Sequence, residues 1–226
     1  MSGIQWQYLF NPSLALESLP FILQGLGYTL WISVVSMTFG TILGFFLALF
    51  RLSKFKVLNL LSRIYISFMR GTPMLVFLFI LYFGFPFIGI KFDAVTAAVL
   101  GFSLHSSAYI AEISRACLNS IDKGQWEASY ALGMPYFFIM RKIILPQALR
   151  TAIGPLSNVL LDLIKGTSLA AMITVPEIFQ QAKIVGGREF DYMTMYILVA
   201  LVYWGICSLF TILQTILEKK FSLYTN

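Results

Sequence analysis

The stretch LGYTLWISVVSMTFGTILGFFLALF, residues 26–50, decides the fold class because it is long, mainly apolar and free of charged side chains. A helix needs about 20 mainly apolar residues to cross the hydrocarbon core of a bilayer. Four further stretches fit this template, at residues 64–85, 95–114, 148–170 and 193–217. Hydrophobic residues make up 58% of the chain and charged residues 12%, with a mean hydropathy of +0.81. The sequence therefore predicts an all-α, polytopic membrane protein with about five transmembrane helices.

Two of these spans contain residues that interrupt helices. The second includes Arg70-Gly71-Thr72-Pro73 and the fourth includes Gly154-Pro155. Because proline removes a backbone donor and favours a bend, we expect an interruption at each place.

The segment before the first span, residues 1–25, contains no apolar run long enough to add another crossing. Its aromatic and apolar side chains alternate with polar ones, at Trp6, Tyr8, Phe10 and Leu14. Amphipathic aromatic rings are favoured where a membrane meets water. We expect this segment to lie at the outer interface of a single membrane domain that covers residues 1–226.

The basic residues predict the orientation of the chain. Of the 16 Lys and Arg residues, only Lys91, Lys183 and Arg188 fall on one side of the predicted membrane, while Lys165 lies within a span. The others fall on the opposite side, and cytoplasmic loops carry such an excess. This pattern places the N-terminus outside, the C-terminus in the cytoplasm and the protein in the cytoplasmic membrane. It also explains the net charge of +6 without nucleic acid.

Residues 124–146 form a charged, amphipathic island between two apolar spans. Charge and unpaired backbone are costly in hydrocarbon, so this segment is expected in water, on the cytoplasmic side. Good helix formers followed by Gly133 and Pro135 predict a short helix with a marked stop. The residues that we expect to contact a partner are Gln125, Trp126, Glu127, Ala128, Ser129, Leu132, Gly133, Met134 and Pro135. An ordinary solvated loop is the alternative.

Polar residues recur at helical spacing inside two spans. His105, Tyr109 and Glu112 share one face of the third span. A second set shares one face of the fourth span: Thr151, Pro155, Asn158, Asp162 and Lys165. Ionisable groups within a span indicate a functional site, because lipid exposure is costly. The alternatives are that Asp162 pairs with Lys165, that Glu112 pairs with Arg115, and that His105 is a hydrogen-bonded interior residue.

Several motifs resemble ABC-importer permeases of the polar amino acid uptake family, including its cystine-type branch. They are Glu127-Ala128 with Gly133 and Ile143-x-Leu145-Pro146, Arg70-Gly71-Thr72-Pro73, Tyr109-x-x-Glu112-x-x-Arg115, and Lys165-Gly166-Thr167-Ser168-Leu169. Segment 124–146 corresponds to the EAA loop, through which a separate ATPase drives the membrane subunit. Besides the minor change to Ser129, where a second alanine is usual, two residues depart from the family pattern: Phe77, where glutamine is frequent, and Gly166, where an acidic or amide residue is common.

The resemblance implies a transmembrane subunit that moves a polar amino acid by alternating access. Its partners would be ATP-binding subunits, a second permease subunit and an extracytoplasmic amino-acid-binding protein. The candidate substrate-binding residues are Asn158, Asp162, Glu112, Tyr109, His105 and Lys165. Asp162 or Glu112 would accept hydrogen bonds from the amino group, while Lys165 or Asn158 would meet the carboxylate. Independently of the resemblance, Pro176, Gly186 and Gly187 indicate that residues 175–191 are a polar, conformationally permissive loop on the outer side. This loop would form part of the docking surface for the binding protein or a plain connector.

The motifs that are absent narrow the function further. There is no G-x-x-x-x-G-K-[ST] pattern, so we expect no ATP or other cofactor on this chain, with ATP and Mg²⁺ held by the partner subunit. One histidine and no H-E-x-x-H or G-x-S-x-G pattern argue against a hydrolase or a metal site. The alternative function is an ion-coupled secondary amino acid transporter, in which Asp162 or Glu112 carries the ion.

Overall fold

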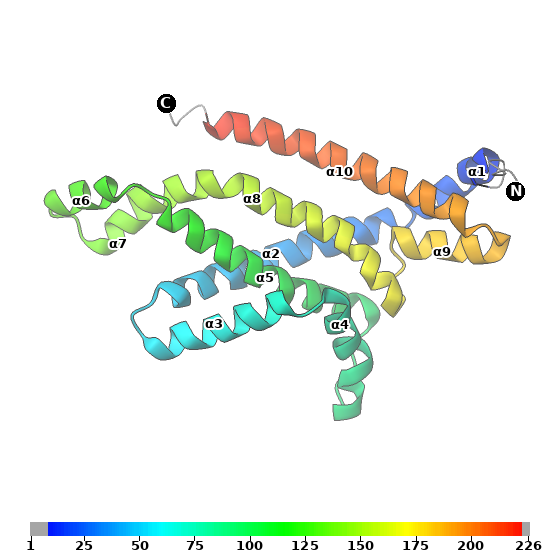
Figure 1. Cartoon of the computed structure of the whole chain (residues 1–226), viewed down its shortest axis with the longest axis horizontal. Helices are drawn as coiled ribbons and strands as arrows, with labels where there is room; N and C mark the ends of the chain where they lie inside the picture. Colours follow the sequence, from blue (N-terminus) through cyan, green and yellow to red (C-terminus); the bar gives the residue numbers. More distant parts are fainter. Residues whose placement is uncertain (1–8, 223–226) are drawn as a thin grey trace, which may run out of the picture. The chain divides into compact units, whose positions relative to one another are not determined.

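The computed structural model describes residues 9–222, and within them every regular element is helical (Figure 1). Trp6 and Tyr8 lie outside this range. Four helical stretches are long and apolar enough to cross a membrane: Leu26–Leu52, Ala94–Asn119, Tyr136–Ile173 and Tyr192–Ile216. A fifth crossing is possible if the bent pair Lys56–Gly71 and Met74–Ile88 counts as one. The predicted fold class is confirmed, whereas the orientation of the termini stays a prediction.

The second predicted span is broken where the sequence indicated. Helix α3 (Lys56–Gly71) ends before the extended residues Thr72 and Pro73, and α4 (Met74–Phe79) begins after them. Pro73 cannot continue the hydrogen-bonding ladder of α3, and it places its neighbour outside the helical region. By contrast, α8 (Leu145–Gly166) continues through Gly154 and Pro155. The expected interruption of helical structure there was therefore wrong.

Two widened turns explain how the chain accommodates other prolines. The π-helical segments η2 (Ile80–Gly84) and η4 (Met140–Ile144) each end two residues before a proline, at Pro86 and Pro146. The amide of the residue after each segment donates to the carbonyl five residues earlier, from Phe85 to Ile80 and from Leu145 to Met140. This wider spacing shifts the pattern of backbone hydrogen bonds just before a proline, which has no N–H to donate. The helical stretch that contains the fourth predicted span begins at Tyr136, with α7 (Tyr136–Ile139), and not at the predicted residue 148.

The chain groups into two compact units, each built from three separate segments. Unit 1 comprises Met1–Ser36, Pro73–Phe102 and Leu161–Thr211. Unit 2 comprises Met37–Thr72, Ser103–Leu160 and Ile212–Asn226. The single-domain organisation stays a prediction.

The core of unit 1 joins α1 (Pro12–Leu23), α9 (Ile178–Glu189) and α10 (Tyr192–Ser222). Ile22, Ile178 and Met195 are fully buried in it. Within the segment before the first span, residues 12–23 therefore form a helix that packs on the chain itself. The place of this segment at the outer interface stays a prediction.

Residues 175–191 are not the permissive loop that the sequence indicated. Most of them form α9, and Gly186 and Gly187 lie inside that helix. A Cβ atom at Gly186 would approach Tyr192 Cδ1 to 2.8 Å, so this glycine is required for close packing. The expectation of a loop failed because tertiary packing overrode the local glycine signal.

A buried carboxylate begins α9. Glu177 is fully buried, and its side chain caps the helix by accepting from Gln180 N at 2.7 Å. Tyr203 Oη donates to the other carboxylate oxygen at 2.6 Å, and Thr167 lies 3.4 Å from the same hydroxyl. Burial raises the pKa of the Glu177 carboxyl above its ordinary value, although these hydrogen bonds oppose the rise.

This raised pKa predicts a pH-dependent stability. The folded chain holds the Glu177 proton more tightly than the unfolded chain, so the contribution is fully present below the unfolded-state pKa. It is lost as the pH rises through the folded-state pKa. We expect the unfolding temperature of the purified transporter to fall over that interval, and Glu177→Gln to flatten the fall. The exposed variant Glu189→Gln should keep the wild-type slope, and equal slopes for wild type and Glu177→Gln would contradict the assignment.

Unit 2 brings helices together through small residues. A Cβ atom at Gly40 would approach Ser106 Oγ to 2.2 Å, and one at Gly44 would approach Ser107 O to 2.8 Å. Glycines spaced by four residues thus let α2 (Leu26–Leu52) lie close against α5 (Ala94–Asn119), as is common between membrane helices. Tyr65 of α3 completes this packing by donating to Leu104 O at 2.9 Å.

Candidate functional site

The expected short helix in segment 124–146 is present as α6 (Lys123–Ala131), which joins α5 to α7 (Figure 1). Asp122 caps its start by accepting from Gly124 N at 2.6 Å. At its end Gly133 adopts a left-handed conformation with φ of 72°. The amide of Gly133 donates to Tyr130 O at 2.9 Å, and that of Met134 donates to Ser129 O at 3.2 Å. These bonds are those of a Schellman-type stop, as the sequence predicted.

The helix α6 has an inner and an outer face. Ser129 is buried and donates to Gln125 O at 2.6 Å, while Trp126 and Met134 pack against the core of unit 2. The ring of Trp126 stacks on Tyr130 and Tyr136, with centroids 6.4 and 5.9 Å apart. The contact with Tyr136 joins α6 to α7.

The remaining predicted contact residues of this segment are exposed: Gln125, Glu127, Ala128, Leu132, Gly133 and Pro135. Leu132 is 74% exposed although it is apolar. The other three predicted contact residues lie on the inner face, where they attach α6 to unit 2: Ser129, Trp126 and Met134. Contact of any of these residues with a partner remains a prediction.

Glu112 of α5 belongs to an ion-pair cluster in unit 2. Glu112 Oε1 accepts from Arg51 Nε at 3.2 Å, and Glu112 Oε2 accepts from Arg115 at 2.8 Å. The pairing of Glu112 with Arg115 was one of the alternatives read from the sequence. Arg51 was missed, because it lies 61 residues earlier in the chain and no local spacing reveals it.

Tyr109 lies between two other groups of the same unit. The Arg70 guanidinium is 5.4 Å from the centroid of its ring, and the His105 ring is 5.2 Å away. Arg70 belongs to the motif that ends α3, so this motif both breaks the helix and delivers a cation to α5. The structure thus brings His105 and Tyr109 together, as their spacing predicted.

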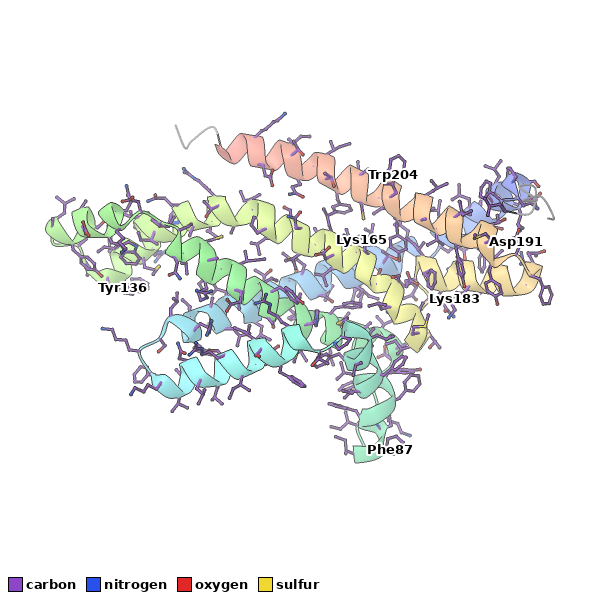
Figure 2. All side chains as sticks on the ribbon, in the orientation of Figure 1. Phe87, Tyr136, Lys165, Lys183, Asp191 and Trp204 are labelled. Carbon is purple, nitrogen blue, oxygen red and sulfur yellow. The ribbon has the colours of Figure 1, made fainter. Side chains whose placement is uncertain are left out.

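The polar face of α8 is exposed along its whole length. Every member of the predicted stripe is exposed: Thr151, Pro155, Asn158, Asp162 and Lys165. The opposite face carries the buried residues Ala148, Ala152, Leu163 and Ile164. Lys165, labelled in Figure 2, lies 2.9 Å from Asp162 Oδ1. The second alternative read from the sequence, pairing of these two side chains, is therefore also observed.

Gly166, one of the two departures from the family pattern, has a packing reason. A Cβ atom there would lie 3.3 Å from Phe102 Cε1, so a larger side chain would have to displace this ring. Phe77, the other departure, is buried in unit 1.

Comparison of the chain with known proteins identifies its family. Residues 40–223 match the sequence pattern of a protein family, the binding-protein-dependent transport system inner membrane component. The chain belongs to this family. The permease protein YckA of Bacillus subtilis (strain 168) is 62% identical over 99% of each chain. The L-cystine transport system permease protein TcyB of the same organism is 42% identical, over 91% of this chain and 88% of TcyB.

Solved structures agree with this membership. The crystal structure of an amino acid ABC transporter with histidines superposes with a TM-score of 0.87 at 33% identity, over 91% of this chain and 96% of that chain. The MetNI methionine ABC transporter, at 20% identity and a TM-score of 0.75, shares the fold. This inner membrane component is therefore a multi-pass protein of the cytoplasmic membrane and the membrane subunit of an ABC importer, not the ATPase.

Proposed function

We propose that the chain passes a polar amino acid across the cytoplasmic membrane by alternating access, along the polar face of α8. The observation that carries this proposal is that all five members of the stripe are exposed in a helix that spans the membrane. A charged or amide side chain facing hydrocarbon costs about 2.5–3.5 kcal/mol on insertion scales. In the assembled transporter this face is therefore expected to meet water or protein, not lipid.

The chemistry of Asp162 and Lys165 suits a zwitterion. An amino acid carries an ammonium and a carboxylate, and each would find its complement in one partner of this ion pair. Exposed pairs contribute only about 0–1 kcal/mol to stability, so substrate can replace the mutual contact at little cost. The amide of Asn158 lies one helical turn before Asp162 and adds donors and an acceptor to the same face.

The α5 cluster supports a different role for Glu112. Both of its oxygens already accept from arginines, so a substrate ammonium would have to compete with two guanidinium groups. We assign Glu112 to positioning Arg51 and Arg115. Tyr109 and His105 remain candidates for substrate contact.

The partners follow from the family. A membrane subunit that lacks a phosphate-binding loop needs ATP-binding subunits, and the family pairs it with a second permease subunit. We propose in addition that an extracytoplasmic amino-acid-binding protein delivers the substrate. ATP and Mg²⁺ would be held entirely by the ATP-binding subunits.

The test is uptake of radiolabelled amino acids by the complete transporter in proteoliposomes. Uptake should require ATP on the side of the ATP-binding subunits. Uptake driven by an ion gradient without nucleotide would overturn the proposal.

Asp162→Asn is expected to lower the uptake rate at limiting substrate by about tenfold or more, because a charge-assisted hydrogen bond contributes about 1.5–3 kcal/mol. Assembly should be unaffected, since the side chain of Asp162 is 74% exposed. Glu17→Gln is the control, because Glu17 is also an exposed carboxylate and lies outside α8 and outside residues 175–191. Equal uptake by Asp162→Asn and the wild type would leave Asp162 without a transport role.

A further inference from the structure

A basic cavity lies beside the hairpin of α2 and α3 in unit 2, separate from the polar face of α8. Its volume is about 840 Å³, and its charged lining consists of Arg51, Arg63, Arg70 and Glu112. A neighbouring cavity of about 440 Å³ shares Arg63 and adds Lys54 and Lys56. Together the two cavities gather five basic side chains around one carboxylate.

That carboxylate does not neutralise the cavity. Glu112 is engaged by Arg51 and by Arg115. Within the described residues 9–222, Arg63 has no hydrogen bond or ion pair, and Arg70 contacts the ring of Tyr109 without a salt bridge. The site therefore keeps unmatched positive charge on guanidinium groups, whose planar forks fit phosphate oxygens in a bidentate manner.

An apolar wall borders the same cavity. Leu60, Ile64 and Phe68 recur every four residues along α3, line the cavity and are 57, 57 and 56% exposed. Binding of a free anion does not require an apolar stripe beside the basic residues. A phospholipid needs both parts, a cationic pocket for the headgroup and an apolar track for the acyl chain.

The position along the helices agrees with this ligand. Arg51 is in the last turn of α2, and Lys54 and Lys56 lie in the connection to α3 and at its first residue. Basic residues at the end of a span lie at the headgroup level, where the cytoplasmic leaflet supplies anionic lipid. The side assigned to this hairpin by its basic residues is also the cytoplasmic one.

From this arrangement we infer that the α2–α3 hairpin binds the headgroup of an anionic phospholipid, with its phosphate on Arg63 and an acyl chain along Leu60, Ile64 and Phe68. This lipid site goes beyond the proposed transport pathway, and its test does not depend on the transported substrate. Free phosphate is the other source of the same chemistry.

The decisive experiment measures phosphatidylglycerol retained by the complete transporter, purified from nanodiscs of phosphatidylcholine with phosphatidylglycerol and analysed by native mass spectrometry. Arg63→Gln should lower the occupancy of bound phosphatidylglycerol by about tenfold, as expected for a lost charge-assisted contact. Arg141→Gln is the matched control, because Arg141 is an exposed arginine of the same unit outside both cavities. Equal retention by Arg63→Gln and Arg141→Gln would overturn the site.

A second arm separates lipid from free anion. Leu60→Ser with Ile64→Ser should lower lipid retention while leaving binding of inorganic phosphate unchanged. Displacement of the lipid by millimolar inorganic phosphate, or unchanged lipid retention by the serine variant, would overturn the lipid assignment. Both positions are more than half exposed, so the variant is expected to keep the wild-type unfolding temperature.

Discussion

Gly25→Ala is expected to unfold unit 1 or to keep the chain from accumulating in the membrane. An added Cβ atom would lie 2.4 Å from both Glu177 C and Ile178 N, and 2.7 Å from Glu177 O. All three atoms are backbone, so no rotamer change relieves the overlap. The junction of α1 and α2 would have to move away from the start of α9, which exposes the buried Glu177 carboxyl. We expect a loss of more than about 3 kcal/mol, above the usual range for overpacking.

The matched control for Gly25 lies two residues along the chain. A Cβ atom at Gly27 meets nothing within 4 Å, and Gly27 is in the first turn of α2. Gly27→Ala should keep or raise the unfolding temperature of the detergent-solubilised transporter, because alanine favours a helix over glycine. The measurement is this temperature, together with the amount of chain extracted from membranes. Similar values for both variants would show that the contact between residue 25 and Glu177 is dispensable.

Features that depend on local sequence could be predicted. Long apolar runs identified the spans, Pro73 marked the break between α3 and α4, and Gly133 marked the end of α6. Each of these features has a local cause: the length of the apolar run, the missing amide of proline, or the positive φ of glycine.

Features that depend on contacts between residues distant in the sequence could not be predicted. The helix α9 is held by Glu177, whose partner Tyr203 lies 26 residues later and whose backbone packs on Gly25. Without these contacts, the two glycines in residues 175–191 suggest a loop. The π-helical turns before Pro86 and Pro146 were not predicted either. A proline in the sequence predicts an interruption of the helix, but it does not show that the preceding turn will widen so that the helix can continue.

The candidate site divides in the same way. Helical spacing alone predicted that the polar residues of α8 share one face, and it offered the i, i+3 pairs Asp162–Lys165 and Glu112–Arg115 as alternatives to a substrate role. It did not predict that Arg51 would share Glu112, or that Arg70 would lie over Tyr109, because both contacts join different helices. Ion pairs between helices are read only after packing is known.

Gly133→Val is expected to abolish ATP-driven uptake while leaving membrane insertion intact. Gly133 has φ of 72°, a conformation that costs a residue with a Cβ atom about 1–2 kcal/mol, and branching at Cβ worsens it. Loss of this conformation removes the bonds to Tyr130 O and Ser129 O that end α6. The exposed side chains of Glu127 and Leu132 would then lose their fixed position. ATP hydrolysis by the partner subunits should continue, uncoupled from transport.

A graded series at this position separates conformation from bulk. A Cβ atom at Gly133 meets nothing within 4 Å of this chain, so any steric penalty from size must come from the partner. Asparagine tolerates the left-handed region better than alanine does, although it is larger. If conformation is the cause, uptake in proteoliposomes falls in the order Gly133→Asn, Gly133→Ala, Gly133→Val. If Gly133→Ala transports better than Gly133→Asn, the partner's surface rejects bulk and the helix stop is not what coupling requires. Glu127→Lys, which leaves the stop intact, should abolish uptake in either case, because it reverses the charge that α6 presents.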